Sequence, residues 1–283
     1  MEYVTLHNGV KMPALGFGVY QIPDPKICTK SVLDAIRVGY RLIDTAASYG
    51  NEAAVGEAII KSGVKREDLF ITTKVWIQDV GYEKTKLAFE RSLQRLRLDY
   101  LDLYLIHQPY SDVFGAWRAM EELHKQGRIR AIGVCNFPDY RVMDLIANSG
   151  ITPMINQIET HPFHQQQNSA EFLKANKVQI QSWGPFAEGR NNLFTNELLT
   201  SIAGLHRKSV AQVVLRWLLQ RGVVAIPKSV HAERMAQNFE VFDFRLTDQE
   251  MALIAGLDQG KSLFFSHQDP QMVKNLSAYT IGA

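Results

Sequence analysis

The feature that most constrains the fold is a regular alternation of short apolar runs with longer segments of helical hydrophobic period. The runs lie at residues 14–16, 42–44, 69–73, 101–106, 129–134, 154–157, 178–181 and 223–226. Strands joined by helical crossovers pair in parallel, which allows an open doubly wound sheet or a closed barrel. Eight units without a low-complexity linker favour closure, so we predict a (β/α)₈ TIM barrel that forms a single domain over residues 1–283.

The N-terminus precedes this repeat with two further extended segments. Residues 3–7 and 10–12 flank Asn8-Gly9, a pair favoured in two-residue hairpin turns, so we predict a β-hairpin that plugs the barrel floor. The next segment, Gly16-Phe17-Gly18-Val19, lacks the third glycine of a dinucleotide-binding fingerprint. We expect a tight turn there, with cofactor contacts from Gly18 and Val19.

Composition narrows the class of partner. The 31 basic and 29 acidic side chains give a formal charge of +2, which provides no field for nucleic acid or anionic lipid. Two cysteines argue against a disulfide framework or a multi-cysteine zinc site, and the chain has neither an export signal nor an apolar run near the ~18 residues of a membrane span. We therefore expect a cytoplasmic monomer that takes a small-molecule substrate, without a metal.

Polar side chains follow or end the apolar runs, at the place where barrel enzymes carry their active sites. They are Asp44, Lys74, His107, Asn136, Gln157, Trp183 and Lys228. Each alone has a structural explanation, such as a cap, a buried histidine or an ion pair. Together with Tyr49 on the loop after Asp44, they predict one constellation at the barrel mouth.

The chemistry of this constellation suits proton delivery to a carbonyl. A tyrosine exchanges protons poorly near neutral pH, but a lysine at about 4 Å favours the phenolate by roughly 4 kcal/mol at an effective dielectric of 20, or about three pKa units before desolvation. We expect Lys74 to lower the pKa of Tyr49 in this way, Asp44 to pair with Lys74, and His107 to orient the carbonyl oxygen. The constellation has no nucleophile of its own, so a cofactor must supply the attacking group, plausibly hydride.

A basic cluster follows the last run. Ile226-Pro227-Lys228-Ser229-Val230 leads into a helical segment that contains Arg234. Barrels commonly bind phosphate at the loops after the seventh and eighth strands, near a helix N-terminus. The place of Lys228 and Arg234 therefore predicts a phosphate site.

Four blocks in the same order resemble the aldo-keto reductase family. They are Asp-Thr-Ala-Ala-Ser-Tyr-Gly-Asn-Glu at 44–52, Gly-Val-Cys-Asn-Phe at 133–137, Asn-Gln-Ile-Glu at 156–159 and Ile-Pro-Lys-Ser at 226–229. The resemblance implies an NADPH-dependent reductase in which Tyr49 is the general acid, Lys74 and Asp44 tune it, and His107 orients the carbonyl. It also implies a set of cofactor-binding residues: Trp183 against the nicotinamide, Asn136 and Gln157 at its carboxamide, Gly184, Pro185 and Phe186 along the pyrophosphate, Lys228, Ser229, Val230 and Arg234 at the 2′-phosphate, and Gln237 and Asn238 near the adenine.

Two departures from the family pattern bear on the carboxamide contact and on the substrate pocket, respectively. Cys135 stands where the family often has serine, and Gln108 follows the histidine where a tryptophan is common. The likeness is to bacterial-type members, including diketogluconate and methylglyoxal reductases, so we expect small aldehydes, dicarbonyls or keto-sugars. Candidate pocket walls are Tyr20, Trp76 and Tyr110, and we expect Phe264 or Phe265 of the tail (261–283) to pack near the cofactor cleft.

Two other functions stay open from sequence. His161-Pro162-Phe163-His164 raises a metal-dependent hydrolase on the same barrel, although a zinc site needs at least three ligands and the His-x-His of barrel hydrolases is absent. A catalytically weak NADPH-binding regulatory barrel is the second alternative.

Overall fold

Eight parallel strands pair in the order in which they follow one another along the chain, in a computed structural model that describes residues 1–282. They are β3 (Gly16–Gly18), β4 (Leu42–Asp44), β5 (Phe70–Val75), β6 (Leu101–Ile106), β7 (Ile129–Cys135), β8 (Ile155–Glu159), β9 (Gln179–Trp183) and β10 (Val224–Ala225). The first and last strands meet through a parallel bridge between Leu15 and Ala225, and Gly18 N donates to Pro227 O at 3.0 Å. The structure therefore confirms the (β/α)₈ barrel.

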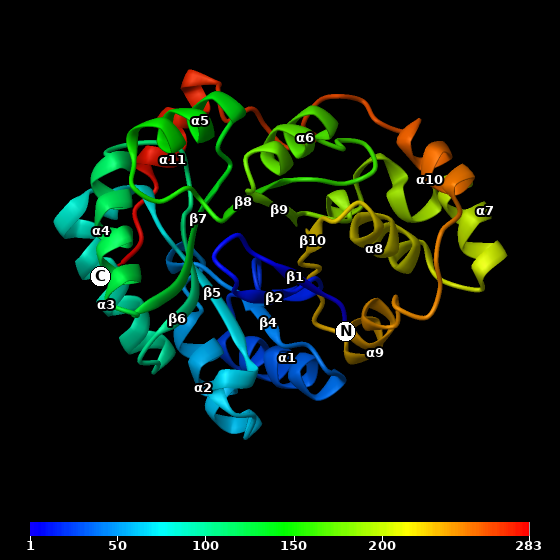
Figure 1. Ribbon diagram of the computed structural model, residues 1–283. Coiled ribbons are helices and arrows are strands. Elements are labelled where there is room, and N and C mark those ends of the chain that lie inside the picture. The colour runs from blue at the N-terminus through cyan, green and yellow to red at the C-terminus, as the bar shows by residue number, and fades with distance from the viewer. Residues whose placement is uncertain (283) are drawn as a thin grey trace.

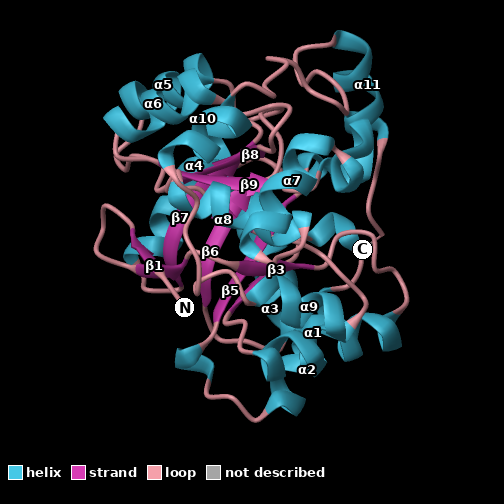
Figure 2. Ribbon diagram, turned by 90° about the vertical axis from the view of Figure 1, so that its right-hand side faces the viewer, coloured by secondary structure: helices cyan, strands magenta, loops and turns pink. Residues whose placement is uncertain are grey.

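Helices surround the strands on all sides (Figures 1 and 2). They are α1 (Pro25–Val38), α2 (Glu52–Ser62), α3 (Tyr82–Leu96), α4 (Val113–Lys125), α5 (Asp139–Asn148), α6 (Gln167–Ala175), α7 (Glu197–His206), α8 (Val210–Gln220), α9 (Ala232–Phe239), α10 (Asp248–Ala255) and α11 (Pro270–Ala278). Short 3-10 turns lie at η1 (Ala47–Tyr49), η2 (Arg66–Asp68), η3 (Ile77–Asp79) and η4 (Ala187–Thr195). None of the helices within residues 1–282 has the length and apolar composition needed to cross a bilayer.

Local signals set several helix starts. The Asp24 side chain accepts a hydrogen bond from Ile27 N at 2.9 Å, directly before Pro25 begins α1. Thr247 and Glu250 form the predicted capping box at the start of α10. Asn51 begins α2 differently: its side chain makes no cap but accepts from Thr45 Oγ1 at 2.8 Å and donates to Val19 O at 2.9 Å, so it joins two mouth loops.

The apolar core lies between the strands and the helices. The predicted stripe of Phe89, Leu93 and Leu96 on α3 is buried, and Trp117 and Trp217 bring the two largest fully buried side chains from α4 and α8. Burying a large apolar side chain stabilises the fold by about 1.5–3 kcal/mol. The rigidity of this layer fixes the carboxyl ends of the strands, where polar side chains replace apolar ones.

The N-terminal hairpin, β1 (Tyr3–Thr5) and β2 (Lys11–Pro13), lies across the barrel floor (Figure 1). Asn8 Nδ2 donates to Arg130 O at 2.9 Å, next to the start of β7. The turn differs from the predicted two-residue form: Leu6 N donates to Val10 O, which leaves three residues in the loop, with Gly9 at a φ of +85°. A three-residue loop uses the glycine as its left-handed residue, so Asn8-Gly9 marks the turn but not its length.

Candidate active site

One buried cation joins the ends of two neighbouring strands and the loop between them at the carboxyl side of the barrel. Lys74 on β5 is fully buried, and its Nζ lies 2.5 Å from Asp44 Oδ1, at the end of β4. The same nitrogen lies 2.9 Å from Thr45 O and 3.4 Å from the hydroxyl oxygen of Tyr49, on η1. An ammonium has three hydrogens, so these three acceptors use all of them and fix its direction.

Asp44 is satisfied on both oxygens. Oδ1 pairs with Lys74, and Oδ2 accepts from Gln157 Nε2 at 2.9 Å across the barrel interior. Lys74 lies inside β5 and Gln157 inside β8, because the backbone ladder extends beyond the apolar run where interior side chains become polar. The polar ends of three strands thus form one hydrogen-bonded network, as the sequence predicted.

The pKa values of Lys74 and Tyr49 are both raised, so the lysine stays charged and the phenol stays protonated and neutral. Burial lowers the pKa of Lys74, but Asp44 more than offsets it, so the pKa stays raised and the side chain stays charged. For Tyr49, burial raises the pKa and outweighs the attraction of Lys74, so the pKa lies above 10. The expectation that Lys74 lowers the pKa of Tyr49 below its ordinary value is therefore wrong: the lysine opposes a larger desolvation cost and leaves a protonated phenol.

His107 directly follows β6 and packs edge-on to Tyr49, with ring centroids 5.6 Å apart. Burial, then the charge of Lys74, lowers the pKa of His107 well below 6.5, so the imidazole is neutral near pH 7. Its Nδ1 lies 3.3 Å from Ser48 Oγ. Ser48, which sequence analysis did not single out, sits inside the quoted block at 44–52 and orients the ring.

Aromatic rings line the mouth around this network. Tyr20 packs on Tyr49 at 4.9 Å, and Trp76 packs on His107 at 5.2 Å. Tyr279, from the C-terminal end, continues the row at 5.7 Å from Trp76, and its carbonyl accepts from Trp76 Nε1 at 2.7 Å. Tyr110 has a different contact: its hydroxyl donates to His267 O at 2.6 Å. Two of the three expected wall residues thus border Tyr49 or His107, and Tyr279 joins them without any local signal in the sequence.

The indole of Trp183 lies at the end of β9, beside the amide residues expected at a nicotinamide carboxamide. Trp183 Nε1 donates to Asn136 Oδ1 at 2.7 Å, and Asn136 Nδ2 donates to His107 O at 3.1 Å. Asn136 takes a left-handed backbone with a φ of 64° directly after β7, which turns its amide toward the mouth. Cys135 Sγ is 3.6 Å from Gln157 Oε1, the long distance expected of a thiol donor.

The expected phosphate residues gather at the start of α9. Lys228 and Arg234 are exposed, and neither takes part in an ion pair within the described residues. Ser229 is buried, and its Oγ accepts from His231 N at 3.1 Å just before the helix. The other expected cofactor residues lie at strand ends, on the loops that follow and on α9: Gly18 ends β3 and Val19 follows it, Gly184, Pro185 and Phe186 follow β9, Val230 precedes α9, and Gln237 and Asn238 lie on α9.

The C-terminal segment brings the ring of Phe264 to the mouth and donates hydrogen bonds to Glu159. The ring of Phe264 packs edge-on to Trp183 at 5.2 Å, whereas Phe265 packs on His267 at 4.7 Å. Of the expected tail, residue 283 lies outside the described residues. Glu159, which sequence analysis did not single out, ends β8 and accepts hydrogen bonds from Ser262 and Leu263 of this segment.

His161 pairs with Glu159 and belongs to no metal-binding cluster of the described residues. Its Nε2 lies 2.9 Å from Glu159 Oε1. Across residues 1–282, no group of three or more His, Cys, Asp or Glu side chains could hold a metal ion.

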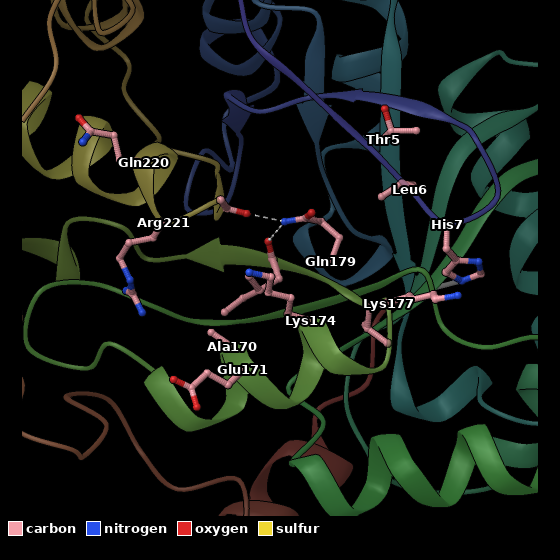
Figure 3. A pocket seen from close by; sticks show the side chains of 13 residues that line it. Thr5, Leu6, His7, Ala170, Glu171, Lys174, Lys177, Gln179, Gln220 and Arg221 are labelled. Atoms are coloured by element: carbon pink, nitrogen blue, oxygen red, sulfur yellow. Dashed lines mark hydrogen bonds between the residues drawn. The ribbon is translucent and has the colours of Figure 1, made fainter.

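A cavity of about 720 Å³ lies at the opposite, amino-terminal end of the strands. It is bordered by the hairpin loop at His7, by Lys174 and Lys177 near the end of α6, and by Arg221 after α8 (Figure 3). Lys174 is in the last turn of α6, where a cation complements the helix dipole. The helix dipole therefore accounts for the positive charge of Lys174 at this position. The cavity is separate from the constellation at the mouth.

Comparisons with known proteins agree with this geometry. A model of the Aldo/keto reductase family matches residues 14–259. The chain is 51% identical over 259 residues to a glyoxal reductase of Bacillus subtilis (strain 168), covering 91% of this chain and 93% of that one. It is 45% identical over 263 residues to a methylglyoxal reductase of Escherichia coli (strain K12), with coverages of 92% and 94%. The crystal structure of a Bombyx mori aldo-keto reductase in complex with NADP matches with a TM-score of 0.89 and 33% identity, covering 97% of each chain.

Proposed function

The chain belongs to the aldo/keto reductase family and reduces carbonyl groups with NADPH, and from this premise we propose that Tyr49 delivers the proton to the carbonyl oxygen. The observation that carries the proposal is the contact of its hydroxyl with Lys74 Nζ at 3.4 Å, inside a mouth that also holds His107. A protonated phenol with a raised pKa is a donor over the whole neutral range. Tyr49 is therefore suited to be the acid of a reduction.

Lys74, Asp44 and His107 support that step in different ways. Lys74 stabilises the phenolate that forms as the proton leaves, and Asp44 holds the ammonium charged in a buried place. His107 is neutral, and we assign the Ser48 hydroxyl as the donor to Nδ1, which places the ring proton on Nε2. That N–H donates to the carbonyl oxygen and stabilises the negative charge that develops on it.

The residues present fit a nicotinamide dinucleotide. Lys228 and Arg234 offer two exposed cations at the N-terminus of α9, the chemistry that binds a phosphate dianion. Trp183 offers an indole ring hydrogen-bonded to the amide of Asn136. When bound, NADPH would supply the hydride, and these residues would hold its two ends.

We propose short dicarbonyl compounds, such as glyoxal and methylglyoxal, as the substrates. The names of two relatives at 51% and 45% identity support this class. So does the aromatic border that Tyr20, Trp76 and Tyr279 form around Tyr49 and His107. We further propose that the chain works as a single-domain monomer in the cytoplasm, without nucleic acid or membrane.

The test is NADPH consumption by the purified protein with glyoxal, methylglyoxal, a keto-sugar and a bulky steroid ketone. The proposal expects the highest kcat/KM for the short dicarbonyls and formation of the hydroxy-carbonyl product. Tight NADPH binding without turnover on any of the four carbonyls would contradict it and favour the regulatory barrel. Preference for the steroid would contradict the substrate class alone.

A further inference from the structure

The C-terminal segment crosses the mouth and is tied down at both ends. At its far end, Gln78 Nε2 donates to Ile281 O at 3.2 Å, and Ile281 N donates back to Gln78 Oε1 at 2.8 Å. At its near end, the chain after α10 reaches β8 at residues 262–265. This near end carries Phe264, so whatever fixes it also fixes the ring that packs on Trp183.

A single buried carboxylate holds the near end. Glu159 is 5% exposed, and its Oε1 accepts from His161 Nε2 at 2.9 Å and from Leu263 N at 3.0 Å. Its Oε2 accepts from Ser262 Oγ at 2.6 Å. The serine oxygen in turn accepts from Phe264 N at 3.0 Å and from Phe265 N at 3.1 Å. The carboxylate therefore determines the backbone of the turn that presents Phe264.

Phe264 transmits this constraint to the indole. Glu159 and Trp183 are in register on β8 and β9, and the Phe264 ring packs edge-on to Trp183 at 5.2 Å. The ring also covers Gly184, since a Cβ added there would lie 3.7 Å from it. On the other side, Arg190 lies over the ring at 4.3 Å and donates to Leu263 O at 2.6 Å. Trp183 is thus held between Phe264 and the amide of Asn136.

We propose that Glu159 is a positioning residue for the nicotinamide end of the coenzyme, acting through Ser262 and Phe264 on Trp183. The inference deepens the proposed function, because it rests on Trp183 stacking on the nicotinamide. An amide cannot replace the carboxylate. The Ser262 oxygen already accepts two N–H groups and must donate its hydrogen, so an amide NH₂ at Oε2 would face a donor. In the flipped orientation the NH₂ would face the Leu263 amide and the His161 ring, which both donate to Oε1, so it is left unpaired either way.

The test separates the two ends of the coenzyme in the purified full chain. Glu159→Gln is titrated with NADPH and with adenosine 2′,5′-bisphosphate, which carries the adenine and the 2′-phosphate but no nicotinamide. We expect NADPH affinity to fall about tenfold, the effect of one lost buried hydrogen bond or aromatic contact, and bisphosphate affinity to stay unchanged. Equal effects on the two ligands, or no effect on either, would overturn the proposal.

Three further variants keep the test decisive. Asp102→Asn is the matched control, because Asp102 is a buried carboxylate that accepts from Ile71 N at the amino-terminal side of the sheet. It should lower stability and leave both affinities unchanged. Ser262→Ala should repeat the selective loss, and it carries the test if Glu159→Gln does not fold. In a Phe264→Ala background, Glu159→Gln should cause no further loss of NADPH affinity, and an additive loss would overturn the proposed route.

The proposed function can fail independently. Trp183→Ala should weaken NADPH and leave the bisphosphate unaffected. If Trp183→Ala leaves NADPH affinity intact, the assignment of Trp183 to the nicotinamide is wrong. If it weakens NADPH while Glu159→Gln does not, only the role of Glu159 is wrong.

Discussion

Lys74 Nζ lies 3.4 Å from the hydroxyl oxygen of Tyr49 while it pairs at 2.5 Å with Asp44, so the buried cation is neutralised on one side and faces the phenol on the other. Both partners lie at one strand end: Asp44 ends β4, and Tyr49 lies on η1 in the loop that follows. We therefore expect activity and stability to depend on the same ammonium but through different partners.

Lys74→Met separates these two roles. The change should lower kcat by about 10²–10⁴-fold, the usual contribution of acid–base assistance, and should destabilise the fold by about 3–5 kcal/mol because Asp44 is left as an unpaired buried charge. Adding Asp44→Asn should restore much of the unfolding free energy and none of the kcat. Urea unfolding and steady-state kinetics on the single and double variants check this, and recovery of activity in the double variant would contradict the account.

The pH profile of carbonyl reduction should be flat between pH 6 and 9. His107 has a pKa well below 6.5, so its neutral form persists on lowering the pH through the range where an ordinary histidine would gain a proton. Tyr49 has a pKa above 10, so the donor form persists on the basic side. Measurement of kcat/KM over this range tests both the neutral state of His107 and the protonated state of Tyr49. A fall to half near pH 6.5 would show that His107 titrates normally.

The double change Lys228→Ala with Arg234→Ala should weaken NADPH binding and spare NADH. Each charge-assisted hydrogen bond contributes about 1.5–3 kcal/mol, so we expect a loss of at least about 100-fold for NADPH and little change for NADH. Lys174→Ala with Lys177→Ala is the matched control, since these cations border the cavity at the other end of the barrel. Similar losses for both coenzymes would show that the pair does not read the 2′-phosphate.

Glu159 should contribute to stability in a pH-dependent way. Burial raises the pKa of this carboxyl, but hydrogen bonds from His161, Ser262 and the Leu263 amide lower it below its ordinary value. A lowered pKa gives stability that is present above the unfolded value of about 4.3 and is lost as pH falls through the folded value. The difference in unfolding free energy between the parent and Glu159→Gln should therefore shrink from pH 7 to pH 3. A difference that stays constant would contradict the assigned hydrogen bonds.

The sequence predicted the barrel and the meeting of Asp44, Lys74 and His107, because parallel strands bring their polar carboxyl ends to one rim. It could not predict the pKa of Tyr49, since a Coulomb estimate from residue types includes the attraction of Lys74 but not the burial of the phenol. The contact between Trp76 and Tyr279 joins residues 203 positions apart, and neither periodicity nor spacing signals it. Asn51 directly precedes α2, yet its side chain joins loops through Thr45 and Val19, because those buried partners compete with the cap.

The most direct test of the central claim is single-turnover hydride transfer with Tyr49→Phe, followed as the loss of NADPH absorbance with methylglyoxal at pH 7. Removing the proton donor should slow the transfer by about 10²–10⁴-fold while NADPH affinity changes less than about twofold. A transfer rate within tenfold of the parent chain would show that another group delivers the proton, and the account of Tyr49 and Lys74 would be wrong.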